Sequence, residues 1–238
     1  LLDELQEKKV DHCTAGLALS CLSLRNLSLP FTEEKKIAQV LPFELEEQLL
    51  LSVDEQIVVR TPVGVGGGEE GTGLLTAAVE KTILAEHLAA LQGNGIEADR
   101  VCPSSYVLAD RLCRAGHGES TFLMLHGDLC SMEIVLVHGG ETVFLRRLFF
   151  PETVFTHSVF QYVDGQVEIA EPDIVAEAVE ALCAVVWQSL DYFSFQNGID
   201  IQSEYFLLTG PMQRCPEFSE RLEEGLELPG RIGDLALE

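Results

Sequence analysis

Apolar and polar residues follow one another along this chain in two periods, one typical of strands and one typical of helices. Short apolar or alternating runs predict strands at residues 13–20, 23–30, 56–60, 74–79, 121–126, 132–137, 142–148 and 204–209. Apolar residues spaced by three and four predict helices at residues 32–50, 81–92, 104–116, 172–197 and 218–226. The mixture of both elements predicts an α/β fold.

Four residues add detail to the predicted helices. Thr32 is expected to cap the first helix with its hydroxyl, and Pro42 to begin a new turn inside that region. The longest helix is expected to stop at Gly198. The single Trp187 lies near the apolar stripe of that helix, so we expect it in the core.

Glycine pairs and runs mark the turns. Residues 139–140 are both glycine and predict a hairpin turn, so residues 121–148 are expected to form a β-meander. The run at residues 64–73 contains a GxGxxG pattern, formed by Gly66, Gly68 and Gly71. No GK[ST] follows it, and the glutamates at residues 69–70 would lie where a pyrophosphate binds, so we expect a plain connecting loop.

The charge of the chain excludes several classes of partner. Its 238 residues include 15 Lys and Arg against 39 Asp and Glu, a formal net charge of −24, and 47% of the residues are hydrophobic. This length and apolar fraction favour a globular chain that folds without a metal or disulfides. The negative charge repels phosphate backbones and anionic lipid head groups, so we expect no nucleic-acid partner. An anionic ligand would need a local exception.

Cysteine usage favours a reducing compartment. The seven cysteines are an odd number at irregular separations, and no CxxC pair exists. We therefore expect buried, reduced thiols and no metal site. The cysteines are Cys13, Cys21, Cys102, Cys113, Cys130, Cys183 and Cys215.

The sequence contains no apolar run long enough to span a membrane and no secretory signal. It opens on Leu1 without a methionine, and residues 1–9 are expected to be the end of an amphipathic helix. The chain is therefore expected to be a piece of something larger.

Two neighbouring segments resemble a known family. The segments LRNLSLPF at residues 24–31 and KIAQVLPFELEEQL at residues 36–49 resemble the cytoplasmic domain of the type II secretion protein GspL and its type IV pilus counterpart PilM. Both families are similar to FtsA in the actin-like ATPase superfamily. The order of the predicted elements is similar to theirs over nearly the whole chain.

The resemblance implies a bilobal actin-like (ribonuclease H-like) fold with an inserted subdomain. The expected parts are a remainder of the first lobe at residues 1–24, the inserted subdomain at 25–102, a return to the first lobe at 103–118 and the second lobe at 119–238. The first strands and the first phosphate loop of such a fold would precede Leu1.

The resemblance also places a second phosphate loop at residues 126–131. Active relatives carry there an aspartate, a hydrophobic residue and a glycine followed by threonine or serine. Here His126 stands where the metal-organising aspartate belongs and Asp128 stands where a glycine belongs, which leaves Ser131 as the surviving feature. Histidine is a poor ligand for Mg²⁺, because this hard ion prefers oxygen.

The adenosine motif is altered in a similar way. A strand, a glycine turn and a helix are predicted over residues 204–226, an arrangement that forms nucleotide sites in α/β folds. Relatives carry a double glycine at the turn, whereas Gly210 is followed here by Pro211, which lacks an N–H donor. No lysine or arginine lies in either segment before Arg214.

The resemblance implies a scaffold whose nucleotide site is degenerate, and not an enzyme. We expect the cytoplasmic domain of an inner-membrane protein of type II secretion, which recruits a GspE-like secretion ATPase. GspM-like and GspF-like platform proteins and a homodimer are further expected partners. No cofactor is expected. The alternative is a PilM-like pilus assembly protein that binds ATP with Mg²⁺, or a weak ATPase.

An acidic stretch is the candidate for partner binding. Glu44, Glu46 and Glu47 lie on a predicted helix of the inserted subdomain, where an acidic face could meet a basic patch of the ATPase. The alternative is that these glutamates only form the solvated face of the helix. For Phe149 and Phe150 the sequence also leaves two alternatives, a partner contact or the buried end of a strand.

Overall fold

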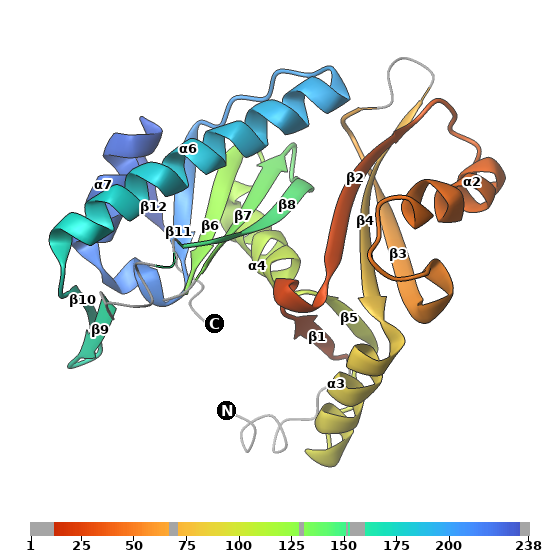
Figure 1. The fold of residues 1–238 in the computed structure, drawn as a ribbon, viewed down its shortest axis with the longest axis horizontal. Helices are drawn as coiled ribbons and strands as arrows, with labels where there is room; N and C mark the ends of the chain where they lie inside the picture. Colours follow the sequence, from red (N-terminus) through yellow and green to blue (C-terminus); the bar gives the residue numbers. More distant parts are fainter. Residues whose placement is uncertain (1–11, 67–70, 129–130, 151, 153–159, 234–238) are drawn as a thin grey trace.

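The computed structural model describes residues 12–66, 71–128, 131–150, 152 and 160–233. Within these residues, the two larger β-sheets form two separate regions of the molecule (Figure 1). The helix end expected at residues 1–9, most of the GxGxxG pattern and Cys130 fall outside the described residues.

The larger sheet has five strands in the order β12-β11-β6-β7-β8. Strands β6, β7 and β8 form the predicted antiparallel meander. Strand β11 pairs in parallel with β6, and β12 pairs in parallel with β11. Gly139 and Gly140 both have positive φ, +58° and +77°, as a tight hairpin turn requires. The strands are β6 (Phe122–Gly127), β7 (Ser131–His138), β8 (Glu141–Phe149), β11 (Tyr205–Thr209) and β12 (Gly230–Ile232).

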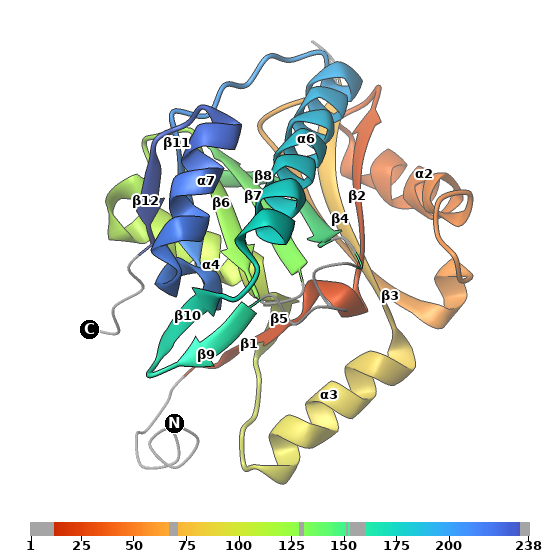
Figure 2. The ribbon, with the colours of Figure 1, turned by 60° about the vertical axis from the view of Figure 1, so that its left-hand side comes forward.

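Helices cover both faces of this sheet. The long helix α6 (Pro172–Asn197) packs beside α7 (Pro216–Leu226) on one face, and α4 (Ser104–Leu112) contacts β7 and β8 (Figures 1 and 2). Most side chains of β6, β7 and β11 are therefore buried on either face. This explains why these strands are nearly continuous apolar runs in the sequence. The predicted helix end is confirmed, since Gly198 adopts the left-handed conformation after Asn197.

The smaller sheet has three antiparallel strands in the order β2-β4-β3. They are β2 (Ser23–Leu29), β3 (Gln56–Val63) and β4 (Thr72–Glu80), and helix α3 (Lys81–Gly93) follows them. Helix α2 (Glu34–Glu46) buries Ile37, Leu41 and Leu45 against Leu27, Leu29 and Leu74 of the sheet. This small apolar cluster is separate from the core of the five-stranded sheet.

Helix α2 differs from the prediction at two points. It begins at Glu34, with Glu33 in the N-cap position and no side-chain cap, so the predicted cap by Thr32 is wrong. Pro42 lies inside the helix and does not begin a new turn. The apolar residues at every fourth position continue past Pro42, and Pro42 itself is exposed, so packing outweighs the lost hydrogen bond.

Short strands were missed by the sequence analysis. The pair β1 (Thr14–Leu17) and β5 (Arg100–Pro103) is parallel, and β9 (Phe160–Val163) and β10 (Gln166–Ile169) form a hairpin. Strand β1 was expected, whereas β5, β9, β10 and β12 were not. Elements of three or four residues carry too little periodicity to be recognised without their partner strand.

Two burial predictions were wrong. Trp187 is 38% exposed, because it lies beside the buried stripe of α6 and not on it. Among the cysteines of the described residues, only Cys183 and Cys215 are buried, and the other four are half-buried free thiols.

Candidate functional site

The four residues expected at the nucleotide site lie close together at one end of the central strands of the five-stranded sheet. Strands β6 and β11 are parallel, and His126 pairs in register with Thr209 at their carboxyl ends. Asp128 and Ser131 lie at the following turn, and Gly210 follows Thr209 directly. We call this group, His126, Asp128, Ser131, Thr209 and Gly210, the turn cluster. The carboxyl ends of parallel strands are where α/β folds commonly bind ligands.

His126 is partnered inside the protein. Its Nδ1 lies 2.9 Å from the Thr209 hydroxyl, which donates in turn to the Leu125 carbonyl at 3.5 Å. Burial lowers the pKa of His126 below its ordinary value, although the nearby carboxylates of Glu133 and Asp128 act in the opposite direction. The imidazole is therefore neutral near pH 7.

Gly210 is required by the close approach of two chain segments. It has φ +80° and ψ −171°, a region that is accessible essentially to glycine alone. A Cβ atom added there would lie 2.6 Å from the Gly127 carbonyl oxygen and 3.0 Å from Cε1 of His126. Pro211 then begins a short 3-10 turn, Pro211–Arg214. The conformation of this turn alone explains why position 210 is a glycine.

The carboxylate of Asp128 binds Ser131. Its Oδ1 accepts a hydrogen bond from the Ser131 N–H at 2.7 Å, and its Oδ2 accepts one from the Ser131 hydroxyl at 3.2 Å. The Asp128 N–H donates to the Ser131 carbonyl at 3.0 Å. These three bonds connect the ends of β6 and β7, so Asp128 stabilises the turn.

Two charged neighbours were not singled out by the sequence analysis. Glu133 is 9% exposed on β7 and accepts a hydrogen bond from the Ser105 hydroxyl at 2.6 Å. Arg147 on β8 donates its Nε to the Ser131 hydroxyl at 3.1 Å. Neither segment carries a cation before Arg214, as the sequence shows, but Arg147 brings one to the site from a strand outside the two motifs.

The β7–β8 register explains why Arg147 was missed. The register shifts between Leu136 and Val137, and beyond this irregularity Glu133 pairs with Arg147 and Ile134 with Arg146. Counting back from the hairpin turn without the shift would pair Glu133 with Arg146. Because side chains alternate between the faces of a strand, a shift of one residue exchanges the two arginines. The two glycines of the turn predict the hairpin, but nothing in the sequence predicts the register shift between β7 and β8.

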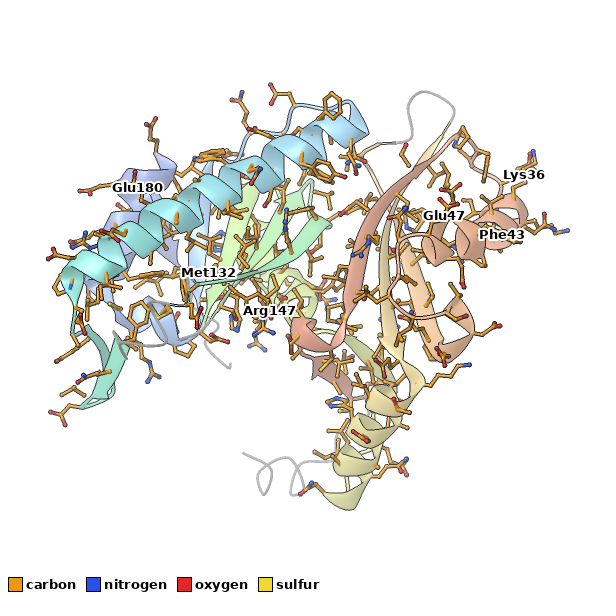
Figure 3. The ribbon with its side chains drawn as sticks, in the orientation of Figure 1. Lys36, Phe43, Glu47, Met132, Arg147 and Glu180 are labelled. Carbon is orange, nitrogen blue, oxygen red and sulfur yellow. The ribbon has the colours of Figure 1, made fainter. Side chains whose placement is uncertain are left out.

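A cleft of about 810 Å³ begins beside the turn cluster and lies between β2 and β8. Its walls include Arg147, Arg146 and Arg25, and its acidic wall residue is Glu44. In Figure 3, Arg147 lies on the side of the five-stranded sheet, and Lys36, Phe43 and Glu47 lie at α2 and its end, beyond β2. We call it the arginine cleft.

The three glutamates expected at a partner surface do not form one face. Glu44 lines the arginine cleft, whereas the carboxylate of Glu46 accepts a hydrogen bond from the Val53 N–H at 3.1 Å. Glu47, which follows α2, is exposed, and so is Phe43, at 76%. Phe149 is 68% exposed and Phe150 is buried, so at the end of β8 one aromatic ring faces solvent and the next lies in the core.

Within the described ranges, no group of three or more His, Cys, Asp or Glu side chains is arranged to hold a metal ion. None of the helices in this same part of the chain has the length and apolar character needed to cross a bilayer.

Comparison with known families gives one match. A family model described as "Type II secretion system (T2SS), protein L" matches residues 2–124, which is just over half of the 238 residues. No curated protein sequence matches the chain.

Several solved structures are similar to this chain. One comes from the PilM-PilN type IV pilus biogenesis complex, with a TM-score of 0.70, 18% identity, and 96% of this chain and 73% of that one covered. Another is a Bacteroides thetaiotaomicron protein with an actin-like ATPase fold and unknown function, with a TM-score of 0.50, 12% identity, and 96% and 73% covered. These two confirm the predicted actin-like α/β fold.

A third similar structure is the cytoplasmic domain of EpsL, an inner membrane component of the type II secretion system of Vibrio cholerae. Its TM-score is 0.49 and its identity 16%, with 88% of this chain and 66% of that chain covered.

Proposed function

Since the chain belongs to the type II secretion system protein L family, we propose that it is a cytoplasmic scaffold domain of an inner-membrane platform protein of that system. In this proposal it recruits a GspE-like secretion ATPase and contacts GspM-like and GspF-like platform proteins, while its own nucleotide site is degenerate. Membership in the family supports a role in a secretion or pilus assembly scaffold. The recruited ATPase and the state of the nucleotide site are our inference.

The observation that carries the proposal is that the polar groups of the turn cluster bind one another. Both carboxylate oxygens of Asp128 accept hydrogen bonds from Ser131, and the ring of His126 is bonded to Thr209. Hydrolysis of a phosphoanhydride requires donors and Mg²⁺ placed around the developing negative charge. Groups that already satisfy one another are not placed for that task.

The donor set also fits ATP with Mg²⁺ poorly. Mg²⁺ prefers carboxylate and other oxygen ligands, whereas the residue at the metal-organising position is the neutral, buried His126. Two carboxylates, of Asp128 and Glu133, are close enough to His126 to act on its charge, and they would repel a phosphate bound beside it. Pro211 removes one backbone donor from the adenosine turn. These residues favour a scaffold over an ATPase.

One observation favours the alternative of a PilM-like nucleotide-binding protein. Arg147 places a guanidinium 3.1 Å from the Ser131 hydroxyl, which is the surviving feature of the phosphate loop. The similar structure with the TM-score of 0.70 comes from a PilM-PilN complex. A weak ATP-dependent switch is therefore the second candidate function.

Titration with a fluorescent ATP analogue in the presence of Mg²⁺ separates the two candidates. We expect no saturable binding below the millimolar range, in the longest soluble form of the domain that can be prepared. A dissociation constant in the micromolar range, lost on Arg147→Gln and retained in Arg114→Gln, would favour the nucleotide-binding alternative. Arg114 is a suitable control because it is exposed and paired with Asp110.

A pull-down with the cognate secretion ATPase tests the scaffold itself. We expect the immobilised domain to retain the ATPase, and Glu44→Lys/Glu47→Lys to weaken this retention at least tenfold, because both side chains are exposed at the α2 end. Glu46 is left unchanged since it binds the Val53 N–H. The matched control is Glu220→Lys/Glu224→Lys, which reverses two exposed charges on α7. A wild-type domain that does not retain the ATPase removes the main support for the proposal.

A further inference from the structure

The arginine cleft is a positive region in a strongly negative protein. The chain has 10 arginines, and three of them, Arg25, Arg146 and Arg147, line this cleft, together with the single acidic residue Glu44. In a chain with a formal charge of −24, this is the local exception that an anionic ligand requires.

The three arginines are engaged by neutral acceptors. Arg25 donates to the backbone carbonyls of Leu24 and Gln48 at 2.7 and 2.8 Å, and Arg146 donates to the Ser189 hydroxyl at 3.0 Å. Arg147 donates to the Ser131 hydroxyl and lies 4.8 Å from the centre of the Phe149 ring.

No carboxylate of the described residues forms an ion pair with any of the three. Arg60, Arg114 and Arg221, by contrast, each pair with an acid. The acids nearest to the cleft are Glu44 on its wall and Glu133, which is held by Ser105. The positive charge of the cleft is therefore not neutralised from within, and a negatively charged occupant would complement it.

The cleft lies between two sheet edges. Strand β8 is the edge of the five-stranded sheet and β2 is the edge of the three-stranded sheet. The side-chain amide of Asn26 donates to the Val143 carbonyl at 2.8 Å and connects the two edges at the start of β8. Figure 1 shows β8 leading away from β2 beyond this point.

Beyond that bridge, no described residue pairs its backbone with the edge of β8. Apart from the β7–β8 ladder, no backbone hydrogen bond within the described chain reaches residues 144–149. An edge with free N–H and C=O groups accepts an added strand, because an extended peptide can continue the ladder.

Arg146 and Arg147 would lie on opposite faces of such an added strand. Arg146 is bonded to Ser189 on α6, on one face of the sheet, and Arg147 to Ser131 on the other face. Successive side chains of a strand also point to opposite faces. Two adjacent acidic residues of an added strand would each meet one arginine, whereas acids two positions apart would both point to the same face.

We propose that the arginine cleft binds an extended acidic segment of a partner protein, which adds to the edge of β8 and presents two adjacent Asp or Glu side chains to Arg146 and Arg147. Arg25 adds positive charge from the opposite wall. The proposal extends the scaffold role by naming the kind of segment that is bound. Its test contains no secretion ATPase, so a failed pull-down and a failed peptide assay are separate results.

Fluorescence anisotropy with labelled octapeptides tests the geometry. In a background of Thr and Val, one set carries adjacent acids at the centre, a second carries two acids separated by one Thr, and a third carries Asn and Gln in place of the adjacent acids. We expect the adjacent-acid peptides to bind at least tenfold more tightly than either other set. Equal binding of all three sets, or binding of none, would overturn the proposal.

Variants of the arginines test the site. Arg146→Gln/Arg147→Gln is expected to weaken the adjacent-acid peptides at least tenfold, and the single variant Arg25→Gln to weaken them less. Arg114→Gln is the matched control and should bind as the wild type does. Unchanged binding by the double variant, with thermal unfolding showing that it is folded, would contradict the proposal.

Hydrogen exchange tests the strand addition. Bound peptide is expected to slow amide exchange in residues 144–149, which a purely ionic association would not do. Inorganic triphosphate is the competing ligand. Triphosphate binding that requires Arg146 and Arg147, without binding of any peptide, would identify a phosphate site and overturn the acidic segment.

Discussion

The turn cluster and the arginine cleft are neighbouring regions that differ in how their polar side chains are paired. In the turn cluster, Asp128 binds Ser131 and His126 binds Thr209, so the polar side chains satisfy one another. In the cleft, arginine side chains are bonded to carbonyls and hydroxyls and keep their full charge. Arg147 connects the two regions, because it lines the cleft and donates to Ser131 of the turn cluster.

Because of this difference, we expect the turn cluster to contribute mainly to stability and the arginine cleft mainly to ligand binding. A hydrogen bond between two protein groups contributes to folding, and its loss leaves a partner unsatisfied. A charged group at the surface contributes less to folding, because water competes for its hydrogen bonds, but it still attracts an ion of opposite sign. Substitutions in the turn cluster should therefore lower the free energy of unfolding, and substitutions in the cleft should change ligand binding.

The largest effect is expected for Gly210→Ala. Its backbone conformation is accessible essentially to glycine, and the added Cβ would lie 2.6 Å from the Gly127 carbonyl oxygen. We expect a loss of about 3 kcal/mol in the free energy of unfolding, measured by urea denaturation. Gly198→Ala is the control, since its φ is +62° but no atom lies within 4 Å of the added Cβ, and it should lose about 1 kcal/mol. Equal losses would show that close approach at Gly210 is unimportant.

Asp128→Ala is expected to have the next largest effect. It removes both acceptors of Ser131 at the end of the β6–β7 turn, and we expect a loss of about 2 kcal/mol in urea denaturation. Asp128→Asn keeps an acceptor and should lose less. The adjacent-acid peptides should bind both variants as tightly as the wild type. A stable Asp128→Ala variant would contradict the structural role given to this carboxylate.

Arg146→Gln/Arg147→Gln is expected to change peptide binding and to leave stability nearly unchanged, the opposite of the turn-cluster variants. We expect a change of about 1 kcal/mol or less in unfolding, because Arg146 is exposed and both guanidinium groups are bonded to neutral hydroxyls. Peptide binding should be lost in the same samples. A large loss of stability would mean that the cleft arginines act in the core and would remove the contrast between the two regions.

The smallest effect is expected for the pH dependence of stability. Burial holds the pKa of His126 below its ordinary value of about 6.5, so protonation is more favourable in the unfolded chain. This contribution to stability is complete above about pH 6.5 and is lost as the pH falls from there towards the lower pKa of the folded state.

Thermal unfolding between pH 5 and 7.5 measures this contribution. In His126→Asn the slope of the melting temperature against pH should be smaller than in the wild type. His12→Asn is the control, because it removes an exposed imidazole in place of a buried one. Identical slopes in all three proteins would show that His126 does not contribute.

The sequence predicted long elements well and short ones poorly. The bounds of α6 agree with the prediction at both ends, because a long run of apolar residues spaced by three and four ends at a glycine that can adopt the left-handed conformation. The strand β5 was missed, since its four residues become a strand only through pairing with β1. Trp187 was placed in the core because the sequence shows that it is near a stripe, but not its angle on the helix.

The candidate site was predicted in part. His126, Asp128, Ser131 and Gly210 lie together, and the resemblance to an actin-like family was sufficient to select them. Glu133 and Arg147 were not selected, because their roles depend on which residues of neighbouring strands lie opposite each other.

The amino-acid sequence by itself determined the order of the main elements, the large excess of acidic residues and the resemblance to a family. These depend on local periodicity and on composition, which do not require knowledge of long-range contacts. The tertiary structure alone decided where the few positive charges lie. The register shift between β7 and β8 sends Arg147 to Ser131 and Arg146 to Ser189. Because strand side chains alternate with a period of two, a shift of one residue decides which face each charge occupies.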